Sequence, residues 1–151
     1  MEKARKNLKI SSIVILILAG FSLLNIIFGL FFGPINEAID NVAGSEEIAK
    51  NIVDITRIII LVVSVLLLLP HLYIGIKGIK IANKPNDSGA HIVWGIILIV
   101  LTAIGFISPI GALIQGNGEI LDNVSSLCNV LFDFVVLIEY VKYARDVQKE
   151  F

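Results

Sequence analysis

The sequence predicts an all-helical integral membrane protein whose four spans form an antiparallel, up-and-down bundle. The prediction rests on four long apolar stretches, on the short connections between them, and on alternating basic and acidic flanks. The first three stretches carry no formal charge and the fourth is interrupted by two carboxylates; they cover residues 10–36, 58–76, 88–118 and 123–141. A helix that crosses a bilayer needs roughly 20 predominantly apolar residues, and each stretch is about that long. Short connections place neighbouring helices antiparallel.

The composition agrees with this fold class. Of the 151 residues, 56% are hydrophobic and 17% are charged, and the mean hydropathy is +0.89. Four spans and their connections use this length, so we expect one membrane domain over residues 1–151 and no separate soluble domain. The chain has one cysteine, Cys128, so no intrachain disulfide can form.

The first span is expected at residues 10–33. Its apolar run is longer than the roughly 7–15 residues of a signal-peptide core, so we expect an uncleaved anchor. In the following connection, 34–54, the apolar residues Ile35, Ile39 and Val42 recur at helical spacing. This spacing predicts a short amphipathic helix at the outer membrane surface.

The second span is expected at residues 55–81, inside a longer helix from about Ser45 to Asn83. Ser45 is followed by two glutamates, a pattern typical of a helix start. At roughly 1.5 Å per residue this helix is over ~50 Å long, more than the ~30 Å of a hydrocarbon core. Its outer end should therefore project from the membrane.

The third and fourth spans are expected at residues 91–114 and 123–143. Residues 83–89 form a cluster of helix-breaking residues between spans two and three, and residues 115–118 form a tight outer turn. Every connection except 34–54 is short, which again favours antiparallel neighbours.

Two prolines lie inside predicted spans. Pro70 leaves the carbonyl of Leu66 without its usual helical donor, and Pro109 does the same to the carbonyl of Gly105. At membrane depth such carbonyls need another protein group or water as a donor.

The positions of lysine and arginine indicate the orientation. Basic residues concentrate in the N-terminal tail, the connection between spans two and three, and the C-terminal tail: Lys3, Arg5, Lys6 and Lys9; Lys77, Lys80 and Lys84; Lys142, Arg145 and Lys149. The other two connections are predominantly acidic. Because lysine and arginine are retained on the cytoplasmic side, both termini are expected to be cytoplasmic, in a multi-pass protein of the cell membrane.

Small and polar residues mark helix contact faces in membranes, because lipid is as apolar as leucine. A sevenfold spacing keeps such a face toward the centre of a left-handed bundle. Faces of this kind occur in spans one to four, at Ser11, Ser22, Asn25 and Gly29; at Arg57, Ser64, His71 and Gly78; at His91, Gly95, Thr102, Gly105 and Pro109; and at Ser126, Asn129, Asp133 and Tyr140. We expect helix packing at Asn25, Gly29, Gly33 and Gly105.

Asp133 is the residue that bears most on function. It lies nine residues before Lys142, hence ~13 Å inside the inner boundary. An ionised carboxylate at the bilayer centre costs at least ~2.5–3.5 kcal/mol, so such residues usually face a partner or water. Asp133 is a candidate proton- or cation-binding carboxylate with His71 as counter-group and Asn129 and Ser64 as neutral ligands. Alternatively, a protonated Asp133 fixes helix register through hydrogen bonds.

Motifs for phosphate binding, metalloprotease chemistry and serine hydrolysis are absent from the sequence. We therefore expect no catalytic residues, no metal site, no cofactor and no nucleic-acid partner. Its richness in Ile, Lys and Asn resembles that of small four-span bacterial membrane proteins in general, without a motif that assigns a family. Two function hypotheses remain. The first is a non-enzymatic protein that acts in the lipid bilayer through helix–helix contacts, as a homo-oligomer or with another membrane subunit. The alternative is a small proton- or cation-coupled transporter or channel.

Overall fold

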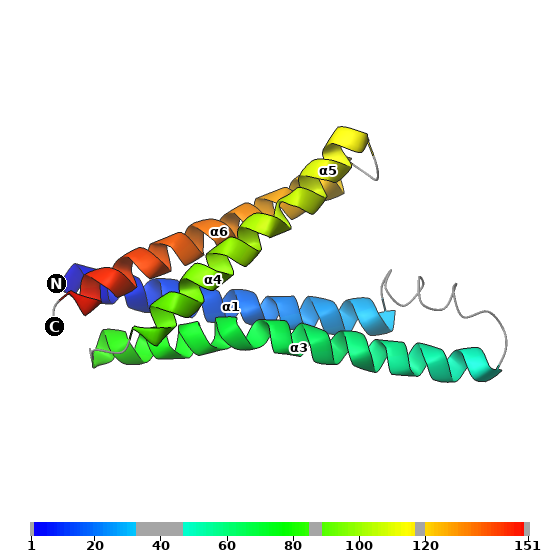
Figure 1. The fold of residues 1–151 in the computed structure, drawn as a ribbon, viewed down its shortest axis with the longest axis horizontal. Helices are drawn as coiled ribbons and strands as arrows, with labels where there is room; N and C mark the ends of the chain where they lie inside the picture. The colour runs from blue at the N-terminus through cyan, green and yellow to red at the C-terminus, as the bar shows by residue number, and fades with distance from the viewer. Residues whose placement is uncertain (1, 33–46, 85–88, 117–119, 150–151) are drawn as a thin grey trace. The chain divides into compact units, whose positions relative to one another are not determined.

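The structure, a computed structural model, describes residues 2–32, 47–84, 89–116 and 120–149, which are almost entirely helical. The helices are α1 (Glu2–Phe32), α3 (Glu47–Asn83), α4 (Ala90–Gly105), α5 (Ile107–Gln115) and α6 (Ile120–Gln148) (Figure 1). Four segments are long and apolar enough to cross a membrane: α1, the part of α3 from Val53 onwards, α4 together with α5, and α6. The prediction of an all-helical chain with four such helices is confirmed.

The helices are longer than the apolar stretches that predicted them. Helix α1 begins at Glu2 and α6 ends at Gln148, so both helices include part of the basic tails. Helix α3 has 37 residues, a length of ~55 Å, which agrees with the expected long second helix. The expected amphipathic helix in the first outer connection falls on residues 33–46, which lie outside the described residues.

The third apolar segment is divided into two helices at Phe106. Pro109 has no N–H to offer the carbonyl of Gly105, and α4 ends at Gly105. The backbone tightens at this point, where the Phe106 N–H donates to the carbonyl of Ala103 at 3.3 Å. Helical bonding resumes in α5, where the Ile110 N–H donates to the carbonyl of Phe106 at 3.2 Å.

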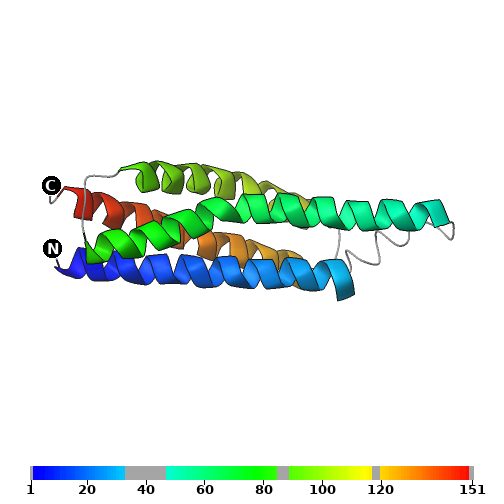
Figure 2. The ribbon, with the colours of Figure 1, turned by 90° about the horizontal axis from the view of Figure 1, so that it is seen from below.

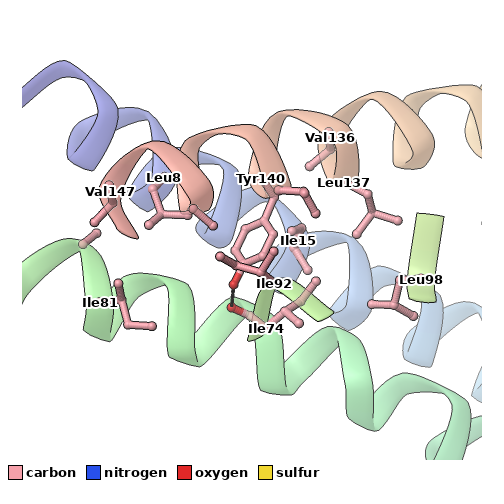
Figure 3. Packing of buried hydrophobic residues seen from close by; sticks show 13 residues of the cluster. Leu8, Ile15, Ile74, Ile81, Ile92, Leu98, Val136, Leu137, Tyr140 and Val147 are labelled. Atoms are coloured by element: carbon pink, nitrogen blue, oxygen red, sulfur yellow. Dashed lines mark hydrogen bonds between the residues drawn. The ribbon is translucent and has the colours of Figure 1, made fainter. Parts of the chain in front are cut away.

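The chain divides into two compact units, one formed by residues 1–16 and 71–151 and the other by residues 17–70. The expectation of one membrane domain stays a prediction. The main hydrophobic cluster belongs to the first unit, where four helical segments contribute to it. Its fully buried side chains include Leu8, Ile15, Ile74, Leu137, Tyr140 and Val147 (Figure 3).

Within the first unit, residues that come later on one helix contact residues that come earlier on its neighbour. Gly75 and Gly78 of α3 lie against Leu16 and Ser12 of α1, so the residue numbers rise on one helix as they fall on the other. The same reversed order holds between α4 and α6, where Gly95 meets Val141 and Thr102 meets Asp133. The start of α1, the end of α3, the start of α4 and the end of α6 therefore share one end (Figures 1 and 2).

Candidate functional site

The structure brings side chains from three helices to one oxygen of Asp133. The Thr102 hydroxyl, on α4, donates a hydrogen bond to Asp133 Oδ2 at 3.4 Å. The Nε2 atom of His71, on α3, lies 3.9 Å from the same oxygen. The His71 and Asp133 side chains are 21% and 29% exposed. The result is a half-buried polar cluster that joins α3, α4 and α6.

Close packing of α4 on α6 sets the position of this cluster. Gly95 has no side chain, so Val141 and Tyr140 approach its backbone; a Cβ at Gly95 would lie 2.7 Å from Val141 Cγ2. Two helical turns further along α4, the same pairing places Thr102 opposite Asp133. On the far side of the cluster, Phe106 and Phe134 pack edge to face with ring centroids 5.6 Å apart.

The arrangement suits proton or cation chemistry. The Thr102 hydroxyl supplies a hydrogen-bond donor to the Asp133 carboxyl group. At 3.9 Å, His71 is an electrostatic neighbour of the carboxylate rather than a hydrogen-bond donor to it. The other ring nitrogen of His71, Nδ1, is buried and has no hydrogen-bond partner in the described part of the chain. Two titratable side chains, His71 and Asp133, therefore share one site with the neutral Thr102 hydroxyl.

The polar face of α6 continues from this cluster into the hydrophobic core. Tyr140 follows Asp133 by seven residues and is fully buried. Its hydroxyl donates to the carbonyl of Ile74 at 3.0 Å (Figure 3). The Tyr140 ring also lies against Gly78 and Gly95. The side of the cluster that faces the basic tails is thus closed by packed side chains.

In the other direction the same face of α6 is exposed. Asn129 precedes Asp133 by one helical turn, and both Asn129 and Ser126 are exposed. Ser64, the second predicted neutral ligand, is half-buried in the unit formed by residues 17–70. The structure therefore places His71 and Thr102 beside Asp133, and an ion- or proton-binding role of Asp133 and His71 stays a prediction.

The predicted packing glycines are not where the helices approach most closely. Gly105 is exposed, and a Cβ there would meet only Val130 Cγ1, at 3.8 Å. That distance is an ordinary van der Waals contact with α6, and the packing role of Gly105 stays a prediction. Gly29 is half-buried and Asn25 is exposed, while Gly33 lies outside the described residues.

The close approaches occur instead at Gly75, Gly78 and Gly95. Gly78 and Gly95 belonged to the predicted polar faces, but the partner of Gly78 on α1 was missed. That partner is Ser12, which is fully buried and donates to the carbonyl of Leu8 at 2.6 Å. The sevenfold spacing of Ser12 and Ala19, both buried, is the signal that would have found this face.

The described residues contain no group of three or more His, Cys, Asp or Glu side chains that could hold a metal ion. Comparison of the chain with protein-family models, curated proteins and solved structures finds no match.

Proposed function

We propose that this chain is a four-span protein of the cell membrane that acts through helix–helix contacts, as an oligomer or as an accessory subunit. In this proposal the spans form an antiparallel bundle, both termini are cytoplasmic, and the protein is non-enzymatic. The alternation of basic and acidic flanks supports the orientation. The reversed contact order within the unit of residues 1–16 and 71–151 supports the antiparallel arrangement.

The observation that carries the contact function is the exposure of Asn129 in the apolar helix α6. An amide in hydrocarbon loses its hydrogen bonds to water, so it is stabilised when another polar group pairs with it. Asn side chains hydrogen-bond across helices in membranes, and small residues such as Ser126 allow close approach. A helix from another chain would supply both the polar partner and the packing.

The packed core beneath Asp133 favours this proposal over a pore. Ile74, Leu137 and Tyr140 are fully buried on the side of Asp133 that faces the basic tails. A conducting path through the described helices would have to displace them. The Tyr140–Ile74 hydrogen bond adds a further contact that such a path would break.

The test is co-purification of two differently tagged copies from native membranes. We expect them to co-purify in mild detergent, or to be recovered with another membrane subunit in a complex much larger than the 16.5 kDa chain. Asn129→Leu should weaken the association about five-fold, since an interhelical hydrogen bond in a membrane contributes about 1 kcal/mol. Val135→Leu, at an exposed position on another face, is the matched control. A solitary chain in native membranes would contradict the proposal.

Proton- or cation-coupled transport is the second candidate, and the convergence of Thr102 and His71 on Asp133 Oδ2 favours it. Transport requires a second conformation in which the core beneath Asp133 opens. In liposomes, Asp133→Asn should then abolish proton or monovalent-cation flux while the fold survives, because the amide keeps the shape and the hydrogen bond to Thr102. Wild-type flux no greater than that of empty liposomes would reject this candidate and leave the contact function standing.

A further inference from the structure

A groove of about 330 Å³ lies between α4 and the last three turns of α6. Its lining changes character along the helix axis. Three cationic side chains line the end nearest the C-terminus: Lys142, Arg145 and Lys149. Ile99, Ile138 and Val141 line the end nearer the middle of the helices. The groove therefore combines a basic end with an apolar end.

The cations of this groove exceed the carboxylates available to them. The Lys149 Nζ atom lies 3.8 Å from Asp146 Oδ1, and Asp146 is the acidic residue of the lining. In the described part of the chain, no carboxylate lies within 4.0 Å of Lys142 or Arg145. The Lys142 ammonium instead lies 5.6 Å from the centroid of the Tyr143 ring. Among the described residues, the basic end of the groove thus carries more positive than negative charge.

The spacing of the cations suits a single phosphate group. Lys142, Arg145 and Lys149 follow one another at three- and four-residue intervals, so they share one face of α6 over ~10 Å. Arginine can bind phosphate oxygens through two parallel N–H bonds, and lysine adds a point charge. Ile138 lies one turn before Lys142, on the side of the expected hydrocarbon core, and is 43% exposed.

We propose that this groove binds one anionic phospholipid, with the headgroup phosphate at Arg145 and Lys142 and an acyl chain along Ile99 and Ile138. The apolar end favours a lipid over a free phosphate ion, because only a lipid would cover Ile138 as well as the cations. Basic pockets between spanning helices on the cytoplasmic side are known to hold anionic headgroups. The inference rests on the orientation in the proposed function, which places these residues at the cytoplasmic leaflet.

The experiment measures lipid retention by the full chain in detergent, using native mass spectrometry. Dioleoylphosphatidylglycerol should be retained as one adduct in preference to dioleoylphosphatidylcholine. The double variant Lys142→Gln/Arg145→Gln should bind the anionic lipid roughly thirty-fold more weakly, from two lost surface charges. Lys3→Gln/Lys80→Gln removes the same charge from exposed positions outside the groove, and should retain the lipid.

Asp146→Asn supplies a change of opposite sign. It removes the carboxylate beside Lys149, so anionic lipid should bind more tightly than to the wild type. A merely structural effect of substitutions on α6 would not produce one variant that weakens binding and another that strengthens it. Lys142→Gln/Arg145→Gln and Asp146→Asn should both melt close to the wild-type temperature. The side chains of Lys142 and Arg145 are exposed, and that of Asp146 is 43% exposed.

Three results would overturn the proposal. They are equal retention of the two lipids, equal losses in the two double variants, and displacement of the lipid by excess inorganic phosphate or by an acidic protein. The last result would identify a phosphate or protein site instead. Co-purification of tagged copies should be unchanged in Lys142→Gln/Arg145→Gln, so failure of lipid binding and failure of the contact function are separately visible.

Discussion

At the scale of single residues, Tyr140 links three helices of the unit formed by residues 1–16 and 71–151. Its ring fills the space above Gly78 of α3 and Gly95 of α4, and its hydroxyl donates to the carbonyl of Ile74 (Figure 3). The hydrogen bond satisfies a polar group that burial would otherwise leave without a partner. Because glycines form two walls of this site, added side-chain volume there should be poorly tolerated.

Gly78→Ala should therefore destabilise the chain by about 1–3 kcal/mol, the usual range for forced overpacking. The new methyl group would collide with the Ser12 hydroxyl and would lie 2.6 Å from Tyr140 Cε2. The control is Gly111→Ala, where the added Cβ has nothing within 4 Å. Alanine is the better helix former by roughly 0.5–1 kcal/mol, so this variant should be neutral or more stable. Thermal unfolding in detergent measures both, and equal effects would show that Gly78 is not a contact.

The residues around Asp133 show how far a sequence can locate a site. The depths of His71 and Asp133, counted from their basic flanks, and the shared direction of spans two and four led us to expect the two residues near each other; they lie 3.9 Å apart. Spacing alone did not single out Thr102 from the other residues of its face. The angular position of a residue on a helix follows from the sequence, but which residue of the facing helix lies level with it depends on the packing of both helices.

At the scale of elements, hydropathy predicted the helices better than their ends. The apolar runs end where lysines begin, yet α1 and α6 continue through their basic tails. They continue because the tails also carry core residues at helical spacing; Leu8 and Val147 are both fully buried. A charge within such a tail marks its exposed side and does not end the helix.

The break in the third span has a specific cause in Pro109, so replacing this residue should remove it. Pro109→Ala restores an N–H that can donate to the carbonyl of Gly105. We expect α4 and α5 to become one continuous helix, with slower backbone amide exchange across residues 105–110. Hydrogen exchange measured by mass spectrometry checks this prediction. Unchanged exchange would mean that the packing of Phe106 against Phe134, rather than the proline, maintains the break.

At the scale of the whole molecule, the sequence predicts the number of apolar helices, and the structure agrees. Orientation across a membrane depends on charges in the connections and is a separate prediction. Reporter fusions at Asn86 and after Phe151 should report cytoplasm, whereas fusions near Gly44 and Asn117 should report the outside. An outside signal at Asn86 would reverse the orientation and would also remove the lipid groove from the cytoplasmic leaflet.

The polar face of α6 has a buried half and an exposed half. Its half near the basic end is packed around Tyr140, and its other half exposes Asn129 and Ser126. Sequence periodicity treats the two halves alike, because it cannot distinguish a face covered by the chain's own helices from one that a second chain covers. The exposed amide of Asn129 is the physical basis of the proposed contact function.

Photo-crosslinking along this face tests whether Asn129 contacts another protein chain. A benzophenone amino acid replaces Asn129 in one variant and Val135 in another, and both are irradiated in native membranes. Val135 is 48% exposed and lies on another face of α6, so it controls for reaction with lipid. We expect a protein adduct heavier than the single chain from position 129 and lipid adducts alone from position 135. No intermolecular protein adduct at position 129 would contradict the proposed contact function.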